Sequence, residues 1–448
     1  MTPTRTRPCS LGLHHLAMVA LVAAFTNEAT AQNDPSGDRS TLSGFLSTFY
    51  TDAGGGSATK TNWVPSIAVS TPAYCSAIKG DTPVTFKAPG MTAVHALCWQ
   101  QPTTGNPNRW GHDVDLCPDL KLDASGNGSF VLHADTFPNG PINLRLYAKD
   151  SGNKQDYCEL QLFNQGGVVW NQGIPRMDPP AAQGMKLAFS DDFDGPLSIA
   201  GDKSGKYWTH WAGGDGSSWP FAENEGPHNP FGQLKGKLKN YLRIHASKPE
   251  GSRGMTGSLT PTHFTSKAPC YLECRFLAQN ATGTWPGFWA CAKRRADLGT
   301  NKGPCDEVDI IEAYGTNSKS GGIWTGYHVT THFWGQPDPK WVTDKAKGPD
   351  GNPYAAHTMV TPMLLGGKSS WSTTFHTYGA LLTPTVTSYF LDDIEVLRHP
   401  SGEISATEPF CFLVNLAIGG GGWNADLQRY GNQSDMWVDY IRVYQGVK

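Results

Sequence analysis

The chain has 448 residues, more than one ordinary domain holds, and this length predicts two domains. Charged residues make up only 17% of the sequence, and 51 glycines and 32 prolines interrupt it, which excludes a helical bundle or a coiled coil. The net charge of -3 gives no general attraction to nucleic acid or to an anionic membrane, and no apolar run reaches the ~20 residues of a spanning helix. With 15 Trp, 15 Tyr and 19 Phe, the composition favours an all-β protein.

The first 31 residues have the features of a secretory signal peptide. Arg5 and Arg7 give a basic start, residues 16–25 are mostly apolar, and Ala29-Thr30-Ala31 fits a cleavage site. We therefore expect a secreted or periplasmic protein that is cleaved near Ala31. Residues 32–71 are rich in Gly, Ser and Thr and are predicted to be a lead-in with at most one strand.

Residues 72–166 predict a small β-sandwich. Four β-rich runs, at 83–86, 130–132, 142–148 and 159–163, alternate with turns rich in Gly, Asn and Asp. The stretch from 138 to 153 resembles bacterial immunoglobulin-like modules attached to secreted enzymes. This segment has no catalytic constellation. Of the remaining roles, glycan binding and a spacer or packing role, the second is favoured. Residues 167–185, with several Gly and Pro, are predicted to be a semi-rigid linker.

The segment from Asp306 to Gly315 carries the most informative pattern. In a β-strand, Glu307 and Asp309 share one face, whereas strict alternation would place Glu312 on the apolar face. A buried charge there would be costly, but one extra residue, a β-bulge around Ile310-Ile311, returns Glu312 to the first face. The sequence thus predicts three carboxylates in a row on one side of a strand.

Three crowded carboxylates repel one another, which raises the pKa of at least one of them. This suits glycoside hydrolysis, in which one carboxylate attacks and another holds a proton near neutral pH. If the three carboxylates are considered without their flanking sequence, the alternative to a catalytic site is an exposed strand face whose acids are solvated.

The flanking sequence resembles glycoside hydrolase family 16 over about residues 186–446. The similar motifs are the opening strand at 187–195, Trp285-Pro286-Gly287-Phe288-Trp289, the carboxylate strand, the segment 412–420 and the closing strand at 436–444. The resemblance implies a β-jelly-roll of two stacked sheets for residues 186–448. It assigns Glu307 as nucleophile, Glu312 as general acid/base and Asp309 as the assisting carboxylate. The bulged form of the strand resembles β-1,3-glucanases and marine-galactan enzymes.

Aromatic and histidine side chains are the candidates for sugar contact. Trp285 and Trp289 precede the carboxylate strand in the family's pattern, and indole faces stack on pyranose rings. His328 and His332 lie on a predicted strand, ~13 Å apart, too far to share one zinc ion. By the resemblance, His332 reaches the substrate site.

The expected export would place the cysteines in an oxidising compartment, in which disulfides form. Nine cysteines remain after the leader, an odd number that leaves at least one unpaired or bonded to another chain. Cys291 and Cys305 bracket the turn before the carboxylate strand and predict a disulfide. Four cysteines of the first domain are expected to form one or two bridges: Cys75, Cys98, Cys117 and Cys158.

The sequence therefore predicts a secreted, retaining endo-β-glycan hydrolase, most simply an endo-β-1,3-glucanase. Alternatives are a transglycosylase or a marine-galactan hydrolase with the same site, and a non-catalytic glycan-binding protein. We expect a monomer that binds polysaccharide, has no nucleic-acid or membrane partner and needs no cofactor. The resemblance also implies a structural Ca²⁺, with Asp439 at a ligand position.

Overall fold

A computed structural model describes residues 62–102, 111–152, 154–209, 217–222, 229–293, 304–315, 326–335, 358–360, 370–419 and 425–446. β-Strands dominate these ranges, which confirms the predicted all-β class. The helical elements are short: η1 (Ala134–Thr136), η2 (Pro180–Ala182), α4 (Glu403–Thr407) and η4 (Gln428–Tyr430). No helix in the described ranges is long and apolar enough to cross a membrane.

The N-terminal part of the described chain forms two sheets. The six-stranded sheet has the order β1 (Asn62–Trp63), β9 (Lys154–Asn164), β8 (Gly140–Lys149), β5 (Ala93–Gln100) and β6 (His112–Lys121), with β3 (Ala77–Ile78) also paired to β9. The three-stranded sheet has the order β2 (Ala68–Thr71), β4 (Asp81–Lys87) and β7 (Asn127–His133). Strands β1 and β2 lie within the predicted lead-in, so the sheets begin ahead of residue 72.

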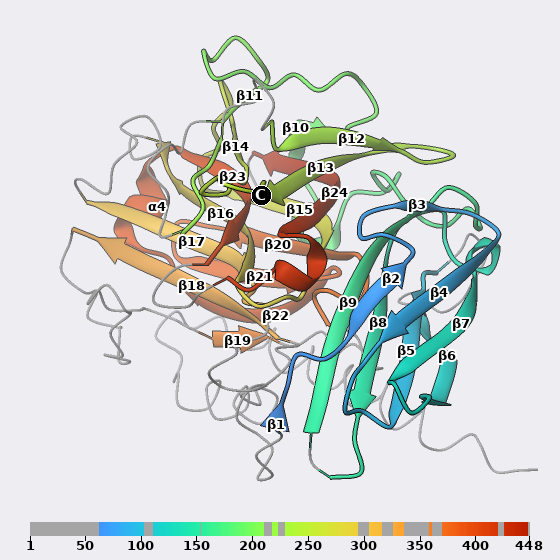
Figure 1. Ribbon diagram of the computed structural model, residues 1–448. Helices are drawn as coiled ribbons and strands as arrows, with labels where there is room; N and C mark the ends of the chain where they lie inside the picture. The colour runs from blue at the N-terminus through green and yellow to red at the C-terminus, as the bar shows by residue number, and fades with distance from the viewer. Residues whose placement is uncertain are drawn as a thin grey trace, which may run out of the picture. The chain divides into compact units, whose positions relative to one another are not determined.

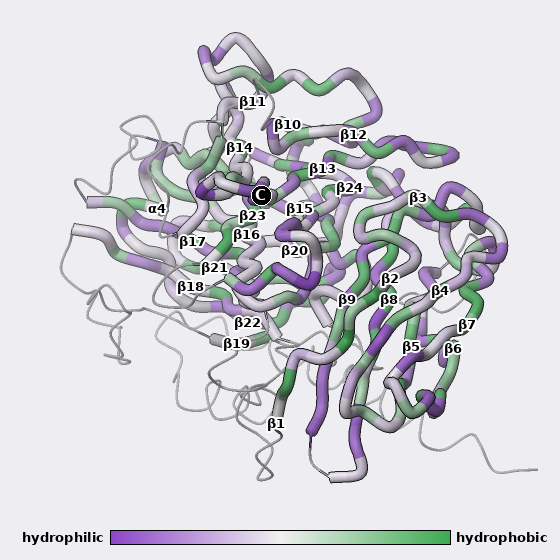
Figure 2. Tube along the Cα trace, viewed as in Figure 1, coloured by the Kyte–Doolittle hydropathy of each residue, from purple (hydrophilic) through white to green (hydrophobic). Residues whose placement is uncertain are grey.

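Strand β4 shows why these segments form sheets with one buried face. Thr82, Val84 and Phe86 are buried, whereas Asp81, Pro83 and Lys87 are exposed. This period of two places apolar side chains on the core face and polar ones toward solvent. The same change between hydrophobic and hydrophilic residues is visible along the strands in Figure 2. The immunoglobulin-like character of this region stays a prediction.

The C-terminal part forms two larger sheets (Figure 1). The eight-stranded sheet has the order β12 (Phe231–Lys235), β13 (Asn240–Ser247), β24 (Gln433–Gln445), β15 (Cys270–Ala278), β20 (His376–Leu382), β21 (Val386–Leu391) and β22 (Ile394–Pro400), with β10 (Lys186–Asp191) also paired to β24. The seven-stranded sheet has the order β11 (Tyr207–Trp208), β14 (Ser258–Pro261), β23 (Phe410–Ile418), β16 (Thr284–Ala292), β17 (Cys305–Glu312), β18 (Tyr327–Trp334) and β19 (Thr358–Val360).

These two sheets pack against each other through apolar inner faces. The rings of Tyr327 on β18 and Tyr378 on β20 meet edge to face at 5.1 Å. The hydroxyl groups of Thr331 and Tyr389 lie 3.1 Å apart across the same interface. The arrangement is a β-sandwich of the jelly-roll class, as predicted. The face of β16, β17 and β18 that points away from the eight-stranded sheet does not pack in this core, so its side chains can form a site.

The predicted linker, residues 167–185, packs closely on the eight-stranded sheet. Trp170 is only 2% exposed and joins a cluster with Tyr241, Phe375 and Trp437. Ala182 and Met185 form a second cluster with aromatic residues of the same sheet. The segment therefore covers part of that sheet's outer face.

Cysteine pairing differs from the prediction. None of the nine cysteines from Cys75 to Cys411, all of which lie in the described ranges, forms a disulfide. The strand register explains why Cys291 does not reach Cys305: Cys291 on β16 lies opposite Glu307 on β17 and opposite Cys411 on β23. The predicted Cys291–Cys305 disulfide and the bridges of the first domain are therefore absent from this structure.

Candidate active site

Strand β17 carries the three carboxylates, and its pairing confirms the predicted bulge. On β16, Trp289 lies opposite Asp309 and Phe288 lies opposite Ile311, which leaves Ile310 as the extra residue. The pairing with β18 shifts at the same place, between Asp309 and Glu312. A bulge of this kind re-aims the side chains that follow it.

The register with β18 places a residue of that strand opposite each carboxylate. Glu307 lies opposite His332, Asp309 opposite Thr330 and Glu312 opposite His328. Directly opposite residues in an antiparallel pair project to the same face. The three acids and both histidines therefore occupy one face of the seven-stranded sheet.

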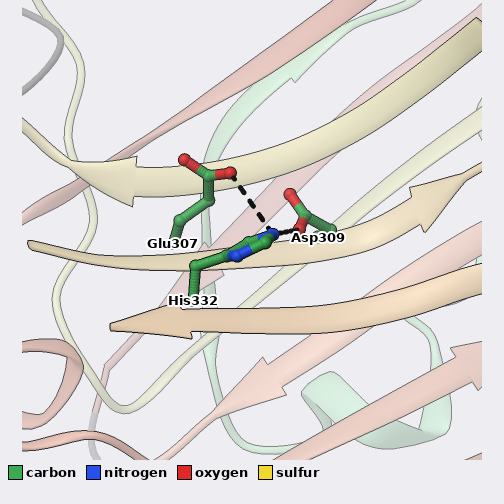
Figure 3. Close-up of side chains that lie close together, drawn as sticks. All are labelled: Glu307, Asp309 and His332. Carbon is green, nitrogen blue, oxygen red and sulfur yellow. Dashed lines mark ion pairs between the residues drawn. The ribbon is translucent and has the colours of Figure 1, made fainter. Parts of the chain in front are cut away.

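His332 lies between two of the acids, as Figure 3 shows. Its Nε2 is 3.2 Å from Asp309 Oδ2 and 4.0 Å from Glu307 Oε1. One donor atom from each of these three residues lies within 4.8 Å of the others, a spacing that a metal ion could bridge. All three residues are more than nine-tenths buried. Water therefore only weakly screens the electrostatic interaction between the imidazole and the two carboxylates.

Glu312, the last residue of β17, accepts hydrogen bonds from two neighbouring side chains. The Tyr314 hydroxyl donates to its Oε1 at 3.0 Å and the Trp285 Nε1–H donates to the same atom at 3.2 Å. Burial, together with the charges of Asp309 and Glu307, raises the pKa of Glu312 to about 8, although His332 and the Tyr314 hydrogen bond act in the opposite direction. Glu312 therefore holds a proton at neutral pH and can donate it.

Glu307 is held by a different donor. The Trp334 Nε1–H donates to Glu307 Oε2 at 3.1 Å, and the Trp334 ring stacks on His332 with 4.9 Å between centroids. Tyr314 and Trp334 were not predicted as site residues. For Trp334 the signal was present, because it lies two positions after His332 on β18 and so shares its face of the strand, whereas Tyr314 lies just beyond the end of β17.

The two tryptophans predicted to contact sugar have different surroundings. Trp285 is partly exposed beside Glu312 and its ring lies 5.6 Å from that of Tyr314. Trp289 is buried, belongs to an apolar cluster and donates its Nε1–H to Asn415 Oδ1 at 2.7 Å. Exposed indole surface is therefore present at Trp285, and also at the partly exposed Trp334.

Asp439, the predicted calcium ligand, lies in the eight-stranded sheet on β24, outside this site. Its Oδ1 is 2.6 Å from Lys239 Nζ and its Oδ2 is 2.9 Å from an Arg275 guanidinium nitrogen. Both carboxylate oxygens thus accept from cationic donors. This environment does not fit a calcium ligand, which needs oxygens turned toward the ion.

Comparisons with known proteins find similarity to glycoside hydrolases. Residues 264–442 match the model of the glycosyl hydrolases family 16. The endo-1,3-1,4-beta-glycanase ExsH of Rhizobium meliloti is 26% identical over 282 residues, which are 58% of this chain and 52% of that protein. The beta-glucanase of Rhodothermus marinus is 26% identical over 195 residues, 39% of this chain and 57% of that protein.

A laminarinase structure from Flavobacterium sp. UMI-01 is also similar, at 21% identity and a TM-score of 0.43, and it aligns with 58% of this chain and all of its own. The chain spans a little over half the length of the two curated relatives. Residues 264–442 are thus similar to the glycosyl hydrolases family 16, and the two curated relatives are a glycanase and a glucanase.

Proposed function

We propose that the protein is an exported, retaining endo-β-glycan hydrolase that cleaves β-1,3-linked glucan. The observation that carries the proposal is the pair Glu307 and Glu312 on one face of β17, with Glu312 protonated at neutral pH because its pKa is raised to about 8. A retaining glycosidase needs one carboxylate that attacks and one carboxylic acid that donates a proton.

In the first step, Glu307 attacks the anomeric carbon while Glu312 transfers its proton to the glycosidic oxygen, and the C–O bond to the leaving sugar breaks. In the second step, Glu312, now a carboxylate, takes a proton from water, whose oxygen attacks the anomeric carbon and releases Glu307. His332 lies between Asp309 and Glu307 and positions these two carboxylates relative to each other. The Trp334 N–H donor keeps Glu307 oriented for attack.

The substrate follows from the partly exposed indoles and the relatives. Trp285 and Trp334 lie beside Glu312 and Glu307 respectively, so each flanks one catalytic carboxylate with a surface for a sugar ring. The relatives are described as a 1,3-1,4-β-glycanase and a β-glucanase. We therefore expect action on polysaccharide glucan, without an organic cofactor, in the extracellular space or periplasm.

The first experiment measures reducing ends released from laminarin, lichenan, agarose and carrageenan by the wild type, Glu307→Gln and Glu250→Gln. Glu250 is exposed and lies outside the site, so its variant is the matched control. We expect release from laminarin, a loss on the scale of ~10⁴-fold in Glu307→Gln and no change in the control. Binding of laminarin without any release by the wild type would instead indicate a glycan-binding protein.

The second experiment tests retention. Glu312→Ala should keep activity on an aryl glycoside with a good leaving group, because that bond breaks without a proton. Azide should enter the vacated space and yield a β-glycosyl azide. An α-glycosyl azide would contradict the retaining mechanism. Products longer than the substrate, formed with an added acceptor oligosaccharide, would identify a transglycosylase.

A further inference from the structure

Lys239 carries a buried ammonium group in the turn between β12 and β13. Its side chain is only 4% exposed. The turn is closed by the hydrogen bond from the Gly236 N–H to the Lys239 carbonyl oxygen, at 2.9 Å. A buried lysine is rare and requires that its charge be compensated and its donors be satisfied.

Three oxygen atoms surround this ammonium group. Its Nζ lies 2.6 Å from Asp439 Oδ1, 2.5 Å from the Asp439 carbonyl oxygen and 3.1 Å from the Asp192 carbonyl oxygen. A lysine ammonium has three N–H donors and no acceptor, so these three oxygens match its donors one for one. The set of one carboxylate and two backbone carbonyls is also the kind of oxygen set that hard metal cations bind.

The Asp439 carboxylate has a second cationic partner. Arg275 donates to Oδ2 at 2.9 Å, and the Gly173 N–H donates to Oδ1 at 2.9 Å. The side chain of Asp439 is fully buried. A divalent ion added here would lie against two positive side chains in a poorly screened environment, where repulsion between like charges is strong.

We propose that the Lys239 ammonium takes the place of a structural metal ion in this protein. The ammonium group joins three segments that are distant in sequence: the β12–β13 turn, the residues after β10, and β24. A metal would join them in the same way, through the oxygens of Asp192 and Asp439. The fold is therefore stable without calcium, and this inference does not depend on the proposed catalytic function.

The test on the full-length wild type requires no variant. Thermal unfolding is followed after dialysis against EGTA and again with added CaCl₂, and bound calcium is measured by mass spectrometry of the dialysed protein. We expect the same Tm in both conditions and no stoichiometric calcium. A Tm that falls with EGTA, or one calcium per chain, would overturn the proposal.

Two variants test the role of the ammonium group. Lys239→Met keeps the apolar stem but leaves Asp439 with one cation, and should lower the Tm by roughly 5–10 °C, the scale for breaking a buried ion pair. Lys235→Met, at an exposed position on β12, is the matched control and should leave the Tm unchanged. Equal Tm values for these two variants would refute the proposal.

Lys239→Ser tests the equivalence of ammonium and metal directly. The shorter side chain vacates the space among the three oxygens, so added CaCl₂ should raise the Tm of this variant while leaving the wild type unchanged. A Lys239→Ser protein whose Tm stays low at every calcium concentration would show that the oxygens do not form a cation site.

Discussion

Glu312 is surrounded by groups that act on its proton in opposite directions. Burial and the charge of Asp309 favour the protonated acid, whereas His332 and the Tyr314 hydroxyl favour the carboxylate. Since the acid form is the one that protonates the leaving group, activity should fall as pH rises through the pKa of about 8. The alkaline limb of the activity profile is thus a direct readout of this one side chain.

The variants Tyr314→Phe and Asp309→Asn should shift that alkaline limb in opposite directions. Removal of the Tyr314 hydroxyl takes away a donor that stabilises the Glu312 carboxylate, so the pKa rises and the limb moves to higher pH. Removal of the Asp309 charge takes away a repulsion, so the pKa falls and the limb moves to lower pH. Profiles of kcat/KM against pH on laminarin measure both.

Circular dichroism melts of both proteins at a fixed pH serve as the control that the site remains folded. Alkaline limbs that coincide with the wild type in both variants would mean that Glu312 is not the group that titrates.

At the scale of the element, strand β9 carries a buried acid at the boundary with the eight-stranded sheet. Glu159 Oε1 accepts from the Asn143 amide, and Oε2 accepts from the Tyr157 hydroxyl and from the Asn280 N–H. Burial raises the pKa of Glu159 to about 7. The hydrogen bonds from Tyr157 and Asn280 act in the opposite direction, so burial is the cause that favours the protonated acid in the folded protein.

Glu159→Gln should remove a pH dependence of stability. The folded state binds the Glu159 proton more tightly than the unfolded state, so this contribution is complete below pH ~4.3 and is lost as pH rises to about 7. The wild type should lose up to about 3 kcal/mol of unfolding free energy relative to Glu159→Gln between pH 4 and pH 8.

Urea unfolding of both proteins across this pH range measures the difference. Glu273, whose pKa is also raised to about 7 by burial, is present in both proteins and cancels in the comparison. A constant difference at every pH would contradict the assignment.

At the scale of the whole molecule, residues 62–185 contact part of the outer face of the eight-stranded sheet. The Gln161 amide pairs with the backbone of Asp435 on β24, donating at 2.8 Å and accepting at 2.9 Å. Asp156 accepts two hydrogen bonds from Arg429. With Phe163 and Trp170 packed on Tyr241, Leu277 and Trp437, this face resembles a domain core more than a surface.

A protein truncated to residues 186–448 should therefore aggregate or fail to fold. The truncation exposes the aromatic side chains of that outer face and leaves Arg429 without its carboxylate partner. Soluble yield and size-exclusion chromatography, compared with a protein that begins at residue 62, measure the effect. Co-expression of residues 62–185 should restore solubility, whereas a soluble, monomeric 186–448 with the full-length Tm would show that the two parts are independent.

The sequence by itself determined the all-β class, the carboxylate strand and the bulge that aligns its acids. These features depend on local periodicity: a charged side chain at an apolar position of a strand forces an extra residue, whatever lies around it. The prediction of Glu307, Asp309 and Glu312 on one face followed from that constraint, whereas His332 was predicted from the family resemblance; the strand register places all four on one face.

Only the tertiary structure decided which groups surround those acids, which cysteines face each other and what covers each sheet. Cys291 lies opposite Glu307 rather than Cys305, and this register depends on how β16 pairs with β17, which neither strand encodes by itself. Asp439 faces Lys239 and Arg275 because three segments distant in sequence meet there. Contacts of this kind depend on long-range packing, which the order of residues along one strand does not specify.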